Sequence, residues 1–243
     1  MLLDVAGRSG PDNMATDAAL LDEADRSGRA FLRFYRWSPP CLSFGRHEPA
    51  ATRYDRAAIA RLGLDVVRRP TGGRAVWHEH EVTYAVAAPV AAFGSLRASY
   101  RAIHERLAAA LRTLGVNTKL ASNGQTVRLS DSPAGCFAAP VGGEVLIGDR
   151  KVVGSAQVRR GAAFLQHGSI LLDGSQDLVT EVSRMPGAAP RATSLSAELG
   201  RTVTFEEVAA AIVAAWGEPL VPSGGPTVRR SDGFSDPAWT WRR

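Results

Sequence analysis

The strand-like runs of this sequence come in consecutive pairs and do not alternate strictly with helices. Residues 31–37 and 41–45 are two such runs. Residues 144–147 and 151–154 form a second pair, joined by the turn-forming Gly148-Asp149. A doubly wound fold needs a helix between successive strands, so the pairing argues against one. The pattern predicts an α+β fold in which helices flank a central mixed β-sheet.

The clearest predicted helix covers residues 96–114, where apolar side chains recur at steps of three and four. A helix is also expected over residues 13–26, with Asp12 as its cap and Gly28 past its end. Further helices are expected at 55–62 and 205–216, and further strands at 65–69, 81–87 and 163–172. The sequence contains no internal repeat or linker, and 243 residues are enough to bury a core without disulfides. Residues 1–243 are therefore expected to form one domain.

Composition argues against several classes of protein. No apolar run approaches the roughly 18 residues that a membrane-spanning helix needs, and the N-terminus shows no leader-peptide pattern. Cys41 and Cys136 are the two cysteines, so no disulfide framework is expected and a reducing cytoplasm is the simplest location. The net charge of +5 fits either a solvated surface or an acidic partner. No cluster of Lys and Arg is interleaved with aromatic residues, which argues against nucleic-acid binding.

Lysine is rare in this chain, because Lys119 and Lys151 are the two lysines among 29 basic residues. An ammonium can shift its pKa, whereas a guanidinium stays charged. A lysine in so arginine-rich a chain therefore suggests a site that needs an ammonium.

The two cysteines have different surroundings in the sequence. Cys41 lies in an apolar strand and is expected in the core. Cys136 lies in a loop rich in Ser, Gly, Pro and Ala, from which a thiol is able to reach a substrate. Lys151 follows on the far side of one hairpin, and its ammonium would lower the pKa of the thiol if the two groups meet. A loop cysteine without a function is the alternative.

A glycine turn is the first candidate ligand contact. Gly72 and Gly73 follow a predicted strand, Arg69 and Arg74 stand beside them, and the segment ends at His78. Glycines let the backbone approach a ligand closely, and arginines suit an anionic group. The alternative is a tight turn with solvated arginines.

Small and polar residues inside strands are the second candidate. Gly154 and Ser155 offer little side chain to pack, so either a ligand or a bulge beside a helix is expected against them. His167 and Gly168 interrupt another strand that is otherwise apolar. A hydrogen-bonded core histidine is the alternative at His167.

Together these segments resemble the biotin/lipoate protein ligase superfamily. Its opening helix is similar to residues 13–21, its first strand pair to 33–45, its glycine signature to 68–78, and its lysine strand and the following strand to 151–157 and 165–172. Within the superfamily, the chain most resembles the Gram-positive type of octanoyltransferase that depends on octanoyl-acyl carrier protein. There the nucleophile stands in a Cys-Phe-(Asp)-Ala-Pro loop, and Cys136-Phe137-Ala138-Ala139-Pro140 stands at that place, with Ala138 in the acidic position.

The resemblance implies a function and a set of site residues. The chain would transfer an octanoyl group from acyl carrier protein to a lysine of a lipoyl-type carrier domain, such as glycine cleavage H protein or a dehydrogenase E2 subunit. The acyl group would pass through a thioester on Cys136, with Lys151 as the second catalytic residue, and neither metal nor cofactor would be needed. The implied substrate-binding residues are Arg69, Gly72, Gly73, Arg74, His78, Gly154, Ser155, His167 and Gly168.

Two other functions remain open on the same fold. An ATP-dependent lipoate-protein ligase makes an acyl-adenylate, would need ATP and Mg²⁺, and would tolerate the loss of Cys136. A non-catalytic binder of acyl or biotinyl groups would bind its ligand without turnover.

Overall fold

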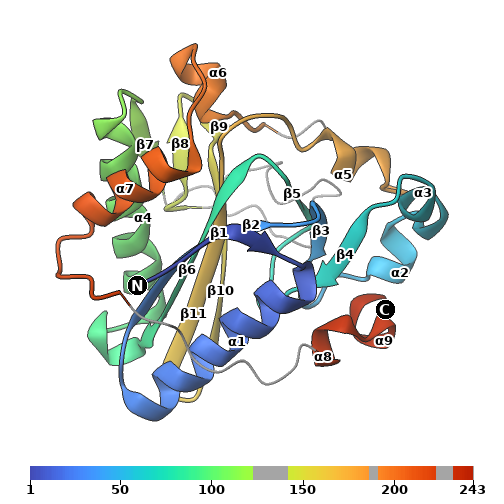
Figure 1. The fold of residues 1–243 in the computed structure, drawn as a ribbon, viewed down its shortest axis with the longest axis horizontal. Coiled ribbons are helices and arrows are strands. Elements are labelled where there is room, and N and C mark those ends of the chain that lie inside the picture. The colour runs from blue at the N-terminus through green and yellow to red at the C-terminus, as the bar shows by residue number, and fades with distance from the viewer. Residues whose placement is uncertain (123–141, 186–190, 223–231, 243) are drawn as a thin grey trace.

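The computed structural model describes residues 1–122, 142–185, 191–222 and 232–242, and the statements below concern those residues. A mixed five-stranded sheet in the order β1-β2-β6-β11-β10 lies at its centre (Figure 1). β1 and β2 are parallel, and the other neighbouring strands are antiparallel. This sheet and its flanking helices confirm the predicted α+β fold. The strands of the central sheet are β1 (Leu2–Arg8), β2 (Phe31–Trp37), β6 (Glu81–Pro89), β10 (Val153–Arg160) and β11 (Ala163–Leu171).

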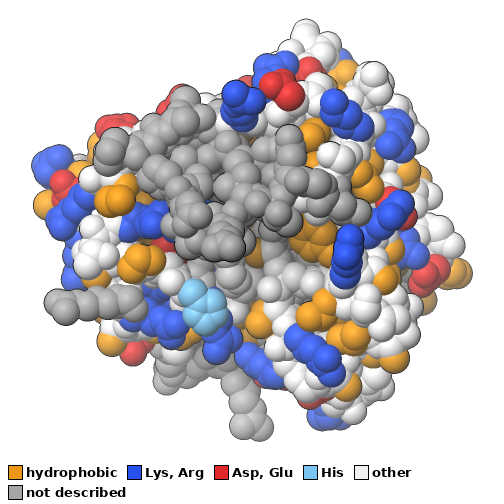
Figure 2. All heavy atoms as spheres, turned by 180° about the vertical axis from the view of Figure 1, so that it is seen from behind, with side chains coloured by type: hydrophobic (Ala, Val, Ile, Leu, Met, Phe, Trp, Pro, Cys, Tyr) orange, Lys and Arg blue, Asp and Glu red, His pale blue; other side chains and the backbone are white. Residues whose placement is uncertain are grey.

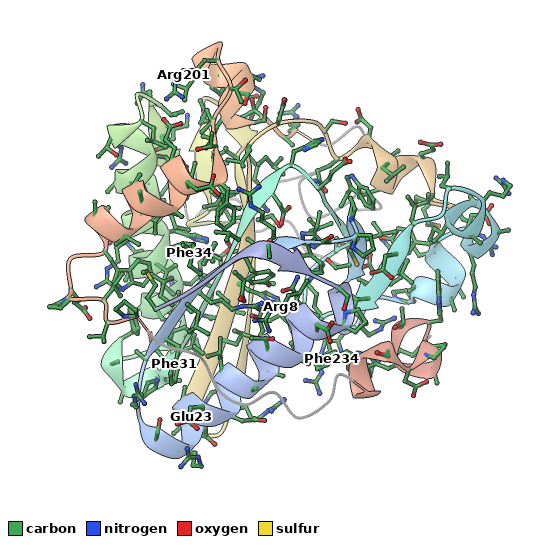
Figure 3. All side chains as sticks on the ribbon, viewed as in Figure 1. Arg8, Glu23, Phe31, Phe34, Arg201 and Phe234 are labelled. Carbon is green, nitrogen blue, oxygen red and sulfur yellow. The ribbon has the colours of Figure 1, made fainter. Side chains whose placement is uncertain are left out.

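Helices pack on both faces of the central sheet, and β2 shows how the sequence divides between them. Leu32 and Phe34 belong to the core cluster shared with α4 and α7, whereas Phe31 and Tyr35 belong to the cluster shared with α1. Figure 3 labels Phe31 and Phe34, one from each cluster. Successive side chains of a strand point to opposite faces, so one strand supplies both cores. The three helices are α1 (Gly10–Ser27), α4 (Leu96–Thr113) and α7 (Phe205–Ala215).

Two smaller three-stranded sheets stand beside the central one. The first has the order β4-β3-β5 and the second the order β7-β8-β9. Figure 1 shows the first near α2 and α3 and the second near α4. Their strands are β3 (Cys41–Phe44), β4 (Asp65–Arg68), β5 (Val76–His78), β7 (Thr118–Leu120), β8 (Val145–Ile147) and β9 (Arg150–Lys151). The short helices are α2 (Ala50–Arg53), α3 (Arg56–Arg61), η1 (Val90–Ala92), α5 (Asp177–Glu181), α6 (Leu195–Leu199), α8 (Asp232–Ser235) and α9 (Pro237–Thr240).

The predicted cap of the first helix is wrong. Ser9, not Asp12, is the N-cap of α1, because its hydroxyl accepts a hydrogen bond from the backbone N–H of Asp12 at 3.3 Å. Asp12 lies one turn inside, where its carboxylate faces the positive end of the helix dipole. Gly28 ends α1 in the left-handed conformation, as predicted.

The hairpin predicted at 144–154 is present, but its second strand is divided in two, because the chain changes sheets there. β9 ends at Lys151 and β10 begins at Val153. The backbone of Val152 bridges the two sheets: its N–H donates to Val145 and its carbonyl accepts from Leu171. Lys151 therefore belongs to the small β7-β8-β9 sheet, while the residues that follow it belong to the central sheet.

Within residues 1–122, 142–185, 191–222 and 232–242, no helix combines the length and the apolar character needed to cross a bilayer.

Candidate active site

A cavity of about 310 Å³, open to solvent on one side, lies between the central sheet and the β4-β3-β5 sheet. It brings together residues from β2, β5, β6, β10 and β11, together with α1 and the segment after β4. Its apolar wall includes Met14, Trp37, Val76 and Ala156. Six of the predicted site residues line it: Arg69, His78, Gly154, Ser155, His167 and Gly168.

His167 lines the cavity and is fully hydrogen-bonded within the protein, as expected of a core histidine, while its part in substrate binding stays a prediction. Its Nδ1 lies 2.8 Å from a carboxylate oxygen of Asp17, and its Nε2 lies 2.6 Å from the hydroxyl of Thr71. A carboxylate only accepts, so Nδ1 carries the proton and Nε2 accepts from Thr71. Burial lowers the pKa of His167, against the opposing effect of Asp17. The ring is therefore a neutral, fixed part of the wall.

Asp17 is a buried anchor that the sequence analysis missed. Its carboxylate accepts from Arg33 Nη1 and from the hydroxyl of Tyr35, each at 2.8 Å, in addition to His167. Burial raises the pKa of Asp17, but the hydrogen bond from His167 and the charge of Arg33 outweigh burial, so the pKa lies below its usual range. The available signal was a carboxylate three residues after Met14, on the apolar face of α1.

Arg69 contacts its own loop. Its guanidinium donates to the carbonyl of Ser43 at 2.9 Å and to those of Gly72 and Arg74 at 3.1 Å and 2.8 Å. These bonds hold the glycine turn against β3. The prediction that arginines here suit an anionic group is not tested by this geometry.

The glycine turn lies next to the cavity but does not line it. Gly73 has a φ of +92°, which favours glycine, whereas a Cβ on Gly72 would meet nothing within 4 Å. The tight approach is at Gly45, where a Cβ would fall 1.9 Å from the carbonyl oxygen of Gly73. The contact between Gly45 and Gly73 thus requires glycine at both positions. Gly45 was not among the predicted site residues.

His78 is held at the end of β5. Its Nε2 lies 2.5 Å from the hydroxyl of Ser43, and its Nδ1 lies 2.8 Å from a carboxylate oxygen of Glu81. Trp37 stacks on the imidazole with ring centroids 4.1 Å apart. Ser169 also donates to Glu81, at 3.0 Å. Glu81 is a second buried carboxylate that the sequence analysis did not single out.

Gly154, Ser155 and Gly168 pack tightly against one another in the cavity wall. Ser155 and Gly168 are paired across β10 and β11. A Cβ on Gly168 would fall 2.5 Å from Ser155 Oγ and 2.6 Å from the carbonyl oxygen of Gly154. Ser155 Oγ in turn lies 2.7 Å from the hydroxyl of Tyr84 and 2.8 Å from His104 Nε2. The side chains that contact Ser155 therefore come from β6 (Tyr84) and α4 (His104).

Lys151 lies outside the cavity lining, on the small sheet. Its side chain is 1% exposed, and its Nζ lies 2.6 Å from a carboxylate oxygen of Glu144. Burial and the charge of Lys151 lower the pKa of His104. His104 is in turn hydrogen-bonded to Ser155 of the cavity wall. Cys136 lies outside the described residues, so its approach to Lys151 stays a prediction.

Cys41 is buried in β3, as expected. Burial raises the pKa of its thiol well above the usual value. A buried thiol of this kind is protonated at neutral pH and unreactive.

Comparisons with known proteins agree with the fold and the segment order. The family described as the lipoyl protein ligase A/B catalytic domain matches residues 9–217. The octanoyltransferase LipM of Moorella thermoacetica is 42% identical over 213 residues, which are 85% of this chain and 77% of that protein. The LipM of Symbiobacterium thermophilum is 37% identical over 238 residues, which are 90% of this chain and 85% of that protein.

Solved structures show the same fold at lower identity. The crystal structure of lipoate-protein ligase A bound with ATP has a TM-score of 0.74 and 21% identity, covering 88% of this chain and 83% of that one. A bipartite lipoate protein ligase of Thermoplasma acidophilum, from a study that includes its E2 lipoyl domain, has a TM-score of 0.69 and 21% identity, covering 99% and 95%. The chain therefore belongs to the lipoyl protein ligase A/B catalytic domain family and is an acyltransferase.

Proposed function

We propose that this acyltransferase moves an octanoyl group from acyl carrier protein to a lysine of a lipoyl-type carrier domain, through a thioester on Cys136. The cavity against β10 and β11 carries the proposal. It is a concave site lined by apolar side chains and a few convergent polar groups, which is the usual form of a ligand-binding site. Its wall combines apolar side chains, which suit a short acyl chain, with hydrogen-bonded polar groups that include the His167 ring and the Arg69 guanidinium. The relatives named octanoyltransferase support the choice of acyl group.

The proposed reaction has two acyl transfers. The Cys136 thiolate attacks the carbonyl of the donor thioester, the new carbon–sulfur bond forms, and the phosphopantetheine thiolate leaves and takes up a proton. The acceptor lysine, as a free amine, then attacks the acyl-enzyme, forming an amide and returning the Cys136 thiol as the amine proton is lost. Exchange of one thioester for another is nearly balanced in energy, and conversion to an amide is downhill, so ATP is not required.

Lys151 supports this chemistry as the proposed source of positive charge. An ammonium near a thiol favours the thiolate, which is the nucleophile. His104 is hydrogen-bonded to Ser155 of the cavity wall, and its pKa is lowered by burial and by the charge of Lys151, so the ammonium acts on a residue that contacts the wall.

The proposed partners are an acyl carrier protein as donor and an H protein or E2 lipoyl domain as acceptor. The net charge of the chain is +5. On the face shown in Figure 2, basic side chains recur across the surface and acidic ones lie mostly toward the rim. Such a surface suits acidic partners, because complementary potentials accelerate their encounter.

Intact-mass measurement tests the proposal. The protein is mixed with octanoyl-acyl carrier protein in the absence of ATP, and we expect a hydroxylamine-sensitive octanoyl adduct that maps to Cys136. Cys136→Ser should lose the adduct by more than about 100-fold, whereas Cys41→Ala, at the buried cysteine, should keep it. Lipoylation that appears only with ATP and free acid, without any adduct, would instead identify a ligase.

A further inference from the structure

The pair formed by Lys151 and Glu144 is buried on both sides. The Lys151 side chain is 1% exposed and that of Glu144 is 3% exposed, with 2.6 Å between the nitrogen and oxygen. Burying two charges costs about as much as their attraction returns, so an apolar pair of similar size would serve stability equally well. Lysine is also the rare cation of this chain. Stability alone therefore does not account for this pair.

The backbone holds the two groups in a fixed relation. Glu144 directly precedes β8, and Lys151 ends β9 on the other arm of the hairpin. The carbonyl of Glu144 accepts from Ala121, while the backbone of Lys151 is bonded on both sides, to Arg191 and Thr193. The carboxylate and the ammonium thus face each other across one hairpin, and backbone hydrogen bonds hold both residues in place.

The groups around this pair come from several elements. His104 on α4 is buried, and burial together with the charge of Lys151 lowers its pKa to about 3, so it is neutral and does not compete for Glu144. Tyr100, one turn earlier, places its hydroxyl 3.5 Å from Glu144. Tyr84 on β6 is kept protonated, because burial raises its pKa. On the outer side, Arg150 pairs with Glu198 at 2.5 Å.

We propose that Glu144 is a positioning residue for acyl transfer, which keeps the Lys151 ammonium charged and aimed in a site that has little water to solvate it. This inference rests on the proposed function for its consequence, because the charge of Lys151 is what would favour the Cys136 thiolate. Glu144 touches neither substrate nor reacting atoms in this scheme. It acts through Lys151. When Lys151 becomes neutral, it no longer stabilises the Cys136 thiolate, and the thiol keeps its proton.

The titration of Lys151 is measurable by itself, because the chain contains two lysines. With ¹³C-lysine, the Cε resonances of Lys119 and Lys151 report two amines, and Lys119 on the surface of β7 serves as the internal reference. In the unaltered protein we expect Lys151 to be charged at neutral pH, because the Glu144 carboxylate lies 2.6 Å from its nitrogen. A Lys151 that is already neutral near pH 7 would overturn the proposal without any variant.

Glu144→Gln removes the charge and keeps the shape of the side chain. A buried lysine without its counter-charge loses its proton more readily, so we expect its titration midpoint to fall by about two units or more. Octanoyl adduct formation near neutral pH should fall by about tenfold or more, and its pH profile should move to higher pH. Glu144→Asp keeps the charge and should restore the Lys151 titration with part of the activity.

Glu198→Gln is the matched control, because it removes the carboxylate that pairs with the neighbouring, exposed residue Arg150. It should leave the titration of Lys151 and the pH profile of transfer as they are. An unchanged Lys151 midpoint in Glu144→Gln would overturn the proposal. If this variant does not fold, the titration of Lys151 in the unaltered protein and in Glu144→Asp decides the question.

The two levels of proposal fail in different ways. The lysine titration needs neither Cys136 nor a substrate, so a missing octanoyl adduct in the unaltered protein refutes the proposed function alone. A normal adduct in Glu144→Gln, with the pH profile unmoved, refutes the role of Glu144 alone.

Discussion

His104 gives the sharpest prediction of how stability depends on pH. The side chain is completely buried on α4. Burial is the main reason that its pKa falls from 6.5 to about 3, and the charge of Lys151 adds to the effect. The unfolded chain binds a proton at this residue near pH 6.5, whereas the folded chain does not until about pH 3. Unfolding therefore takes up a proton in that window, and the free energy of unfolding falls as the pH falls.

The magnitude follows from the size of the shift. Each pH unit below the unfolded pKa costs about 1.4 kcal/mol, so His104 accounts for a loss of about 2 kcal/mol between about pH 7 and about pH 5. In His104→Gln the amide is still able to hydrogen-bond to Ser155 but does not titrate. The variant lacks this loss, so its free energy of unfolding should fall by about 2 kcal/mol less than that of the unaltered protein over this range.

Urea unfolding measures this difference, with the fluorescence of the five tryptophans as the signal. Other titrating groups contribute equally to both proteins and cancel in the comparison. His80→Gln is the matched control, because the His80 side chain is 61% exposed and its removal should leave the acid slope of the unaltered protein. Parallel acid slopes for His104→Gln and the unaltered protein would refute the reasoning.

Two further substitutions test the cavity wall and its anchor. Gly168→Ala forces a methyl group to within 2.5 Å of Ser155 Oγ, so it should lower the free energy of unfolding by about 1–3 kcal/mol and slow acyl transfer. Gly72→Ala places its methyl group in open space and should leave urea unfolding unchanged. Asp17→Asn leaves Arg33 short of a buried counter-charge and should cost about 3–5 kcal/mol by the same assay, against less than about 1 kcal/mol for the exposed Asp22→Asn.

Most of the regular elements were predictable from local patterns. The strand over residues 31–37 and the helix beginning after Ser95 follow from alternation, apolar spacing and capping, and the structure places β2 and α4 there. β1 was missed, because Leu2–Arg8 is mostly exposed and lacks a clear alternation. β5 was missed because a three-residue strand carries too little pattern of its own. Its place is set by pairing with β3, a contact that is distant in sequence.

The candidate site was only partly predictable, for a physical reason. Six of the predicted residues share one cavity, because five lie on strands whose small or polar residues interrupt an apolar pattern, and Arg69 directly follows β4. Asp17 and Glu144 were missed, because each is recognisable as a site residue only from its ion pair with a buried residue on another element. The predicted strand at 151–154 shows the same limit. Its alternation continues through Val152, yet the chain leaves one sheet and joins another at that residue.

The central sheet has buried polar clusters on both faces, and β11 joins them. His167 points to the α1 side, where it contacts Asp17, and Gly168 makes room on the α4 side for the hydroxyls of Ser155 and Tyr84. Buried polar groups are costly unless they are fully hydrogen-bonded, and once bonded they permit few alternative arrangements. The cavity wall is therefore held by directional bonds from both faces of the sheet. A change on either face should alter the position of the same backbone segment, so the α4 face, which reaches the cavity wall through Ser155, belongs to the site.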